Sequence, residues 1–206
     1  MDLRRRILEW LSGFLPAKII LSEGRSYLER YYLFDTKWFG GKTAYLHRFA
    51  QSDTDRGLHD HPWHEAISFM LVGRYRERRL AREIGFDAAA RWTGGAVHLA
   101  ETTQPTTLCE IGTVTRIVAA PALNHIRGRD FHRVEMIDHK PVWTIFIHDR
   151  KPSQMWGFLV PSPADGAAAY EPRYRQTEQV ADRWWKTARR GRTARRDLDR
   201  SVQTIV

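Results

Sequence analysis

The residues of this chain best suited to chemistry are two histidines separated by one residue, His59 and His61. In an extended strand alternate side chains share a face, so these two imidazoles would point the same way. Neutral imidazole is a common ligand of zinc, iron, nickel and copper. A third ligand is expected from a neighbouring strand, and His132 stands in the strand-like run 131–137. The three histidines therefore predict a site for one divalent metal ion.

The elements that must position these histidines are short apolar runs separated by turn residues. The runs are rich in Val, Ile, Phe, Tyr and Trp, as strands are, and Gly, Pro, Asp and Asn punctuate them. Many short strands with little helix between them predict an all-β sandwich or barrel. The run 67–72 is apolar at every position, which predicts burial on both faces. The candidate strands are 27–34, 43–49, 66–72, 74–80, 113–119, 131–137, 142–147 and 155–160.

The two ends of the chain have a different pattern. Ile7, Trp10, Leu11 and Phe14 have helical spacing, which predicts an amphipathic helix whose apolar stripe packs on the core. From Glu178 onward the sequence is polar and compatible with helix. We therefore expect an N-terminal helical segment (1–19), a β-barrel (20–160) and a loop with a basic helical tail (161–206).

Composition and charge narrow the class of protein. The chain has 206 residues, which suits one domain, and no apolar run approaches the ~20 residues of a membrane-spanning helix. Its single cysteine, Cys109, excludes an internal disulfide and a thiolate cluster for zinc. Glu9 interrupts the apolar run after Arg4, and no small-residue cleavage pattern follows, so we expect no signal peptide and a cytoplasmic protein.

Most of the positive charge lies in the tail. Between Arg183 and Arg200 eight basic residues stand against two aspartates, a net charge of +6 out of +9 for the chain. A basic tail from Arg189 to Arg200, with Trp184 and Trp185 before it, could contact nucleic acid through phosphate attraction and stacking. The alternative is a solvated helix face.

The pattern His59-x-His61, an apolar strand closed by Gly73, and His132 after a glycine-containing turn resembles the cupin superfamily. The resemblance covers roughly residues 43 to 150 and implies a jelly-roll barrel, which often dimerises. Its motifs depart from this sequence at several positions. The usual glutamate position holds Ala66, with Glu65 one residue early; Arg127 stands where proline is usual, Gly128 is one residue too far from His132, and Met136 replaces the terminal asparagine.

The resemblance leaves two sets of ligands open. One is the three histidines with a fourth ligand, Glu65 or His64. The other is the three histidines alone, which resembles the thiol dioxygenase branch of cupins with non-haem iron(II). The strand register favours the three-histidine set, because Glu65 lies out of step. Asp60, between the two ligands, should point the opposite way and either orient a neighbouring group or lie at the surface.

Several strand arginines and the remaining histidines are also considered as site residues. An arginine that points inward from a strand would hold a substrate carboxylate bidentately, and none of the candidates is singled out. These candidates are Arg48, Arg74, Arg76 and Arg133. The remaining histidines, His47, His98, His125, His139 and His148, are interpreted as surface or hydrogen-bonded residues.

Three functions follow from this reading. The first is a non-haem iron(II) oxygenase acting on a small molecule at His59, His61 and His132, with zinc, nickel or manganese as alternative metals. The second is a non-catalytic binding or regulatory module whose basic tail contacts nucleic acid. In the third, the metal only stabilises the barrel. A homodimer is expected in each case from the resemblance.

Overall fold

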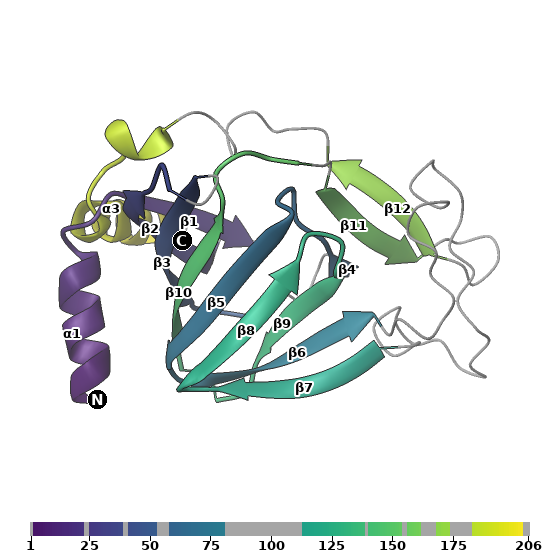
Figure 1. Cartoon of the computed structure of the whole chain (residues 1–206). Helices are drawn as coiled ribbons and strands as arrows, with labels where there is room; N and C mark the ends of the chain where they lie inside the picture. The colour runs from purple at the N-terminus through teal and green to yellow at the C-terminus, as the bar shows by residue number, and fades with distance from the viewer. Residues whose placement is uncertain are drawn as a thin grey trace.

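The computed structural model describes residues 2–22, 25–38, 41–52, 58–80, 113–138, 140–153, 156–161, 168–173 and 183–203. In this part of the chain, twelve strands form two antiparallel sheets of six strands each (Figure 1). Helix α1 (Leu3–Ser12) lies near the N-terminus; the short 3-10 helix η1 (Trp184–Lys186) and helix α3 (Gly191–Gln203) lie near the C-terminus. The predicted all-β fold with short terminal helices is confirmed.

The first sheet has the strand order β1-β2-β3-β10-β5-β8. The second has the order β12-β11-β4-β9-β6-β7. The strands of the first sheet are β1 (Ala17–Ser22), β2 (Arg25–Asp35), β3 (Lys42–Phe49), β5 (Glu65–Val72), β8 (Ala122–Arg127) and β10 (Val142–Asp149). Those of the second are β4 (Leu58–His59), β6 (Arg74–Leu80), β7 (Thr113–Ala119), β9 (His132–Met136), β11 (Trp156–Pro161) and β12 (Ala168–Arg173).

The strands β3 to β10 have jelly-roll topology. The group β3-β10-β5-β8 belongs to one sheet and the group β4-β9-β6-β7 to the other, and the chain crosses between the sheets at every step except from β6 to β7. This double-sheet arrangement of two Greek keys is the jelly roll, the fold that the sequence predicts. The crossing brings β4 beside β9, although they are far apart in the sequence.

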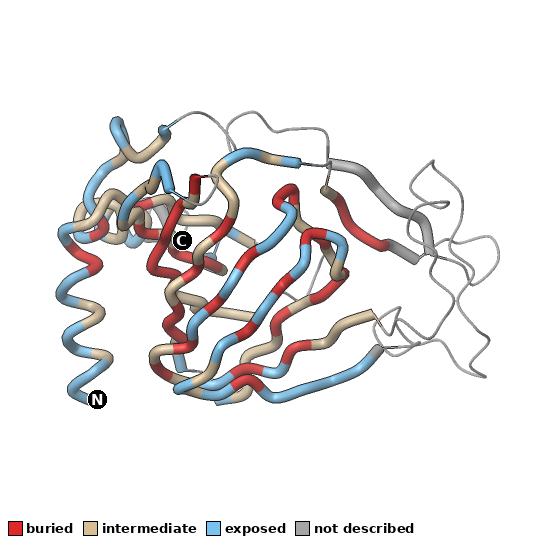
Figure 2. Tube along the Cα trace, viewed as in Figure 1, coloured by how far each residue is buried: buried red, intermediate tan, exposed pale blue. Residues whose placement is uncertain are grey.

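Strand β5 corrects one expectation from the sequence. Its residues alternate between buried and exposed up to Met70, as the tube in Figure 2 also shows. Ala66 and Met70 are buried, whereas Ile67 and Phe69 are 45% and 37% exposed. The prediction of burial on both faces is wrong, because only the inner face of the sheet is covered at β5.

The outer face of the same sheet is covered at β1, β2, β3 and β10. There Leu8, Leu15 and Ala194, from the helical ends of the chain, pack against a buried cluster formed by Ala17, Tyr31, Leu46, Val72 and Trp143. A Cβ at Gly191 would overlap the Ser12 carbonyl group and the Tyr31 ring, so glycine allows α3 to approach this closely. The first sheet therefore has two packed sides, one inside the barrel and one under the helices.

Helix α1 contacts the sheet through a different stripe from the predicted one. Ser12 is buried and Leu8 packs on the outer cluster, while Ile7, Trp10 and Phe14 are 48%, 60% and 49% exposed. The expected docking of the Ile7–Phe14 stripe is wrong, because the packed side of the helix is rotated away from its apolar stripe. Among the described residues, no helix is long and apolar enough to cross a membrane.

Candidate metal centre

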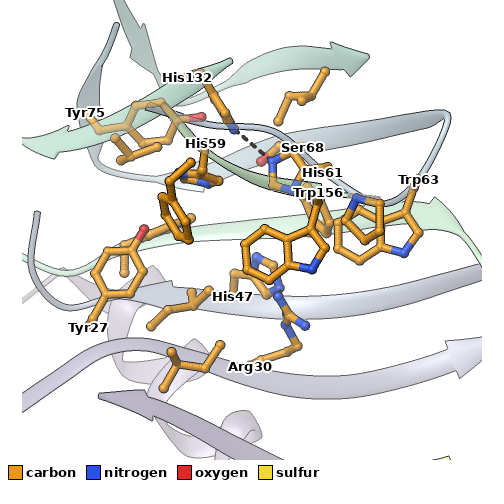
Figure 3. Close-up of a pocket in the computed structure, with 18 residues that line it drawn as sticks. Tyr27, Arg30, His47, His59, His61, Trp63, Ser68, Tyr75, His132 and Trp156 are labelled. Atoms are coloured by element: carbon orange, nitrogen blue, oxygen red, sulfur yellow. Dashed lines mark hydrogen bonds between the residues drawn. The ribbon is translucent and has the colours of Figure 1, made fainter. Parts of the chain in front are cut away.

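The fold brings the three predicted histidines together. His59 in β4 pairs directly with His132 in β9, and His61 follows two residues after His59. One ring nitrogen of each histidine lies within 4.8 Å of the other two. The Nε2 atoms of His61 and His132 are 2.8 Å apart, and the His59 ring centroid is 5.2 Å and 5.1 Å from theirs. Figure 3 shows the three rings converging on one point of a pocket wall.

Backbone contacts hold the His59–His61 segment in place. The amide of His61 donates to the Gly128 carbonyl oxygen at 3.0 Å. Asp60 is fully buried; its amide donates to the Gly157 carbonyl oxygen, and its carboxyl group accepts from the Gly157 amide at 2.6 Å. Burial raises the pKa of Asp60 to about 8, against the lowering effect of these amides. Asp60 thus anchors the segment to β11, and its hydrogen bonds go to backbone amides.

Glu77, a residue that the sequence analysis passed over, supports His132. Its Oε1 lies 2.6 Å from His132 Nδ1, and Glu77 is fully buried. A carboxylate can only accept, so His132 carries its proton on Nδ1 and presents the lone pair of Nε2 to the cluster. The run Arg74–Leu80 looks like an exposed charged strand, but its alternation places Tyr75 and Glu77 together on the buried face.

Two arginines and an asparagine complete the surroundings of Glu77. Arg116 Nε donates to it at 2.7 Å, Arg79 Nη2 at 3.2 Å and Asn124 Nδ2 at 3.1 Å. Burial alone would raise the pKa of Glu77, but the hydrogen bond and charge of His132, with those of Arg79, hold it well below its usual range. Glu77 is therefore a permanent acceptor for the His132 proton.

His61 and His132 are held in the neutral form that binds metal. Burial, followed by the neighbouring His132 and His59, holds the pKa of His61 well below its usual value. Burial also lowers the pKa of His132, although Glu77 opposes that shift. Both rings are neutral near pH 7, and metal ligation requires neutral imidazole. Three converging imidazole nitrogens, one with its tautomer fixed, fit a divalent transition metal.

The proposed fourth ligands lie outside this cluster. Glu65 and His64 are both exposed, and Glu65 Oε1 lies 3.7 Å from His125 Nε2 on the neighbouring strand β8. The alternation of β5 explains this, because Ala66 occupies the inward position and Glu65 faces out. Over the described ranges, the structure therefore brings together His59, His61 and His132 without Glu65 or His64.

The other histidines divide by position. His47 and His148 are buried; His47 Nε2 accepts from Arg30 Nε at 3.2 Å, and His148 Nδ1 lies 2.6 Å from the Asp149 carbonyl oxygen. His125 is exposed. His98 and His139 lie outside the described residues. The interpretation of these residues as surface or hydrogen-bonded fits the three that are described.

The four candidate strand arginines all form ion pairs with carboxylates. Arg48 pairs with Glu29 and Glu9, Arg74 with Asp138, and Arg76 and Arg133 with Glu135. In the C-terminal tail, Arg195 pairs with Glu9 and Arg189 with Asp197. These arginines therefore have protein partners in the structure.

A cavity of about 150 Å³ lies beside the three histidines. Its wall is largely aromatic and aliphatic, with few polar groups, which is typical of small-molecule sites. Arg30 and Ser68 are among the polar residues (Figure 3). The lining residues are Ile20, Tyr27, Leu28, Arg30, His47, Phe49, His59, His61, Pro62, Trp63, Ser68, Tyr75, Ile126, His132, Val134, Phe146, Trp156 and Phe158.

Solved structures with some likeness to this chain include three kinds of protein. Fe(II) HppE in complex with substrate is 10% identical with a TM-score of 0.44; the match covers 65% of this chain and 56% of that one. A cupin-2 domain protein from Rhodospirillum rubrum is 13% identical with a TM-score of 0.44, covering 73% and 78%. Oxalate decarboxylase from Bacillus subtilis, described with Mn(II) centres, is 18% identical with a TM-score of 0.39, covering 64% and 27%.

Comparison of the amino-acid sequence with known families and proteins finds no relative. No protein-family model matches the chain, and no curated protein matches its sequence. The structural likenesses are too distant to carry an argument about this protein. The jelly-roll strand order and the three-histidine cluster are features of the chain itself, and they agree with the barrel and the histidine cluster that the sequence analysis expects.

Proposed function

We propose that the chain is a metal-dependent oxygenase that holds one iron(II) ion through His59, His61 and His132 and acts on a small molecule in the adjoining cavity. The observation that carries this proposal is the convergence of three imidazoles at the wall of a largely apolar cavity. Three protein ligands leave coordination positions free, and a bound iron(II) ion would supply the redox chemistry.

The protein's own contribution is to hold the ligands and shape the cavity. Glu77 keeps the His132 proton on Nδ1, so that Nε2 stays available as a ligand. Trp63, Phe146 and Phe158 line the cavity near the histidines and would pack on the substrate and exclude water. The chemistry would therefore take place in a low-dielectric space, where fixed polar groups act strongly.

The first test is the metal content of protein purified without a histidine tag. We expect about one equivalent of iron in the wild type and in Glu65→Ala, and its loss in His61→Ala, because only His61 belongs to the cluster. Glu65→Ala is the matched control, since Glu65 is a nearby carboxylate that is exposed and lies beside His125. Oxygen consumption with small thiols, acids and aromatic compounds would then be compared in wild type and His61→Ala.

The alternative outcomes separate the competing functions. Zinc or nickel lost in His61→Ala would retain the site but point to a hydrolase or isomerase. Metal loss that lowers the unfolding temperature sharply, with no oxygen consumption on any compound, would favour a structural metal. A wild-type protein that neither contains metal nor takes up added iron(II) would overturn the proposal.

A further inference from the structure

Arg30 is a half-buried cation on the wall of the same cavity. It stands on β2, where its partner across the ladder is His47 on β3. Both residues line the cavity that His59, His61 and His132 line. In Figure 3 Arg30 and His47 lie low in the view, with the three histidines above them around the same pocket. A molecule in the cavity would therefore meet a guanidinium group and the histidine cluster together.

The contacts of Arg30 leave most of its donors available. Its Nε donates to His47 Nε2, and its guanidinium carbon lies 5.2 Å from the centroid of the Tyr45 ring. Among the described residues, no carboxylate forms an ion pair with it. Burial lowers the pKa of Arg30, while Tyr45 and Tyr27 raise it. A guanidinium group nevertheless stays protonated in a protein, so the cavity wall carries a positive charge.

Three other strand arginines, Arg48, Arg79 and Arg116, form ion pairs with carboxylates. Arg48 on the adjacent strand meets Glu29 with Nη1 to Oε1 at 2.5 Å, and Arg79 and Arg116 share Glu77. Removing a guanidinium group from water without a carboxylate partner destabilises the folded protein. Such an unfavourable group is retained where it binds an anionic ligand. Arg30 differs from these residues because the place of its counter-ion is the cavity itself.

We propose that Arg30 is the anion-binding residue of the cavity, and that the substrate is a small carboxylate whose apolar body packs between Arg30 and the three histidines. The planar guanidinium fork matches a carboxylate bidentately. Among the described residues that line the cavity, Arg30 is the one Lys or Arg, so it balances a single negative charge. A cavity of about 150 Å³ has room for a body of about the size of benzene. The substrate class rests on the proposed function; the anion site does not.

The test uses benzoate and its neutral analogue benzamide as probes. Binding would be followed by the fluorescence of Trp63 and Trp156, which line the cavity, in the protein as purified and after treatment with EDTA. We expect benzoate to bind better than benzamide, and Arg30→Met to weaken benzoate by about 10- to 100-fold with little effect on benzamide. Arg25→Met is the matched control, because Arg25 is exposed on the same strand.

The metal content of each variant separates the two proposals. Arg30→Met should keep the metal of the wild type, because Arg30 is not in the histidine cluster. Benzoate binding that depends on Arg30 in protein without metal would support the anion site even if the iron proposal fails. Unchanged benzoate affinity in Arg30→Met, or binding that requires metal and ignores Arg30, would overturn it. If Arg30→Met does not fold, Arg30→Gln is measured against the same two results.

Discussion

The two faces of the first sheet differ in how their arginine side chains are paired with carboxylates. On the outer face, under the terminal helices, the guanidinium groups of Arg48 and Arg195 meet the carboxylates of Glu9 and Glu29. On the inner face Arg30 has no carboxylate among the described residues, and its hydrogen-bonded neighbour is the neutral His47. Adjacent positions on β2, Glu29 and Arg30, belong to these two different environments.

This difference in charge pairing indicates that the two faces have different roles. The outer charges are satisfied within the chain, and they join α1, β2, β3 and α3, so their function is to hold the helical ends on the barrel. The inner charge is left for something that enters the cavity. Functional sites commonly retain such locally unfavourable groups, at a cost to stability. Changes on the two faces should therefore separate stability from binding.

The largest effect on stability is expected for Glu29→Ala. Glu29 is 3% exposed, accepts from Tyr31 and Arg48, and lies 3.7 Å from Arg195. Its removal takes away the more deeply buried of the two carboxylates that Arg48 and Arg195 share and leaves Glu9, so we expect the free energy of unfolding to fall by about 3 kcal/mol. Urea unfolding would measure the loss, and the metal content of the folded protein should not change.

A suitable control is Asp138→Ala, which removes the carboxylate of an exposed pair. Arg74 and Asp138 are 52% and 39% exposed, and such pairs contribute about 1 kcal/mol or less. If Glu29→Ala costs no more than Asp138→Ala, the outer charges do not hold the helices on the barrel.

Acid should act mainly on the inner face, through its buried histidines. Burial, with help from the charge of Arg30, lowers the pKa of His148 to about 3, although Asp149 raises it. The unfolded chain then binds the proton more readily than the folded protein, so this contribution is complete above pH 6.5 and is lost as the pH falls toward 3. Between pH 7 and pH 5 it amounts to about 2 kcal/mol.

His148→Gln removes that contribution. The free energy of unfolding of the variant should fall less between pH 7 and pH 5 than that of the wild type, by the same amount. His125→Gln, at an exposed histidine, is the control and should follow the wild type. Parallel pH curves for wild type and His148→Gln would show that His148 is not held neutral by the inner face.

Short strands separated by turn residues predict an all-β sandwich or barrel, and the resemblance to cupins, which His59, His61 and His132 carry, implies the jelly roll. The spacing of His59 and His61 requires only an extended backbone for both rings to share a face. Glu77 was not predicted, since its strand is charged at most positions and only the covering of one face by β-barrel packing buries it. The sequence does not decide whether Glu65 is a metal ligand, because that depends on the register of β5, whose alternation places Glu65 on the outer face.

Arg30 was missed for a related reason. The orientation of a strand is predicted from the alternation of apolar and polar residues in its sequence. Strand β2 lacks that contrast because it is covered on one side by the barrel interior and on the other by the helices. Its sequence around Glu29 and Arg30 therefore shows no polar face. The alternation does separate the two residues, but it cannot tell which of them faces the cavity. That assignment requires the position of α1 and α3.

The smallest expected change in the free energy of unfolding is that of Arg30→Met, and Arg48→Met is the variant to compare with it. Arg30→Met removes a cation that has no carboxylate partner within the described part of the chain, so the free energy of unfolding should rise by about 1 kcal/mol, with the lost contacts to His47 and Tyr45 limiting the gain. Arg48→Met, on the next strand, leaves Glu29 buried without its guanidinium and should destabilise the protein. Urea unfolding of both variants would measure the difference, and equal losses would mean that Arg30 is a structural residue like Arg48, held for the fold and not for a ligand.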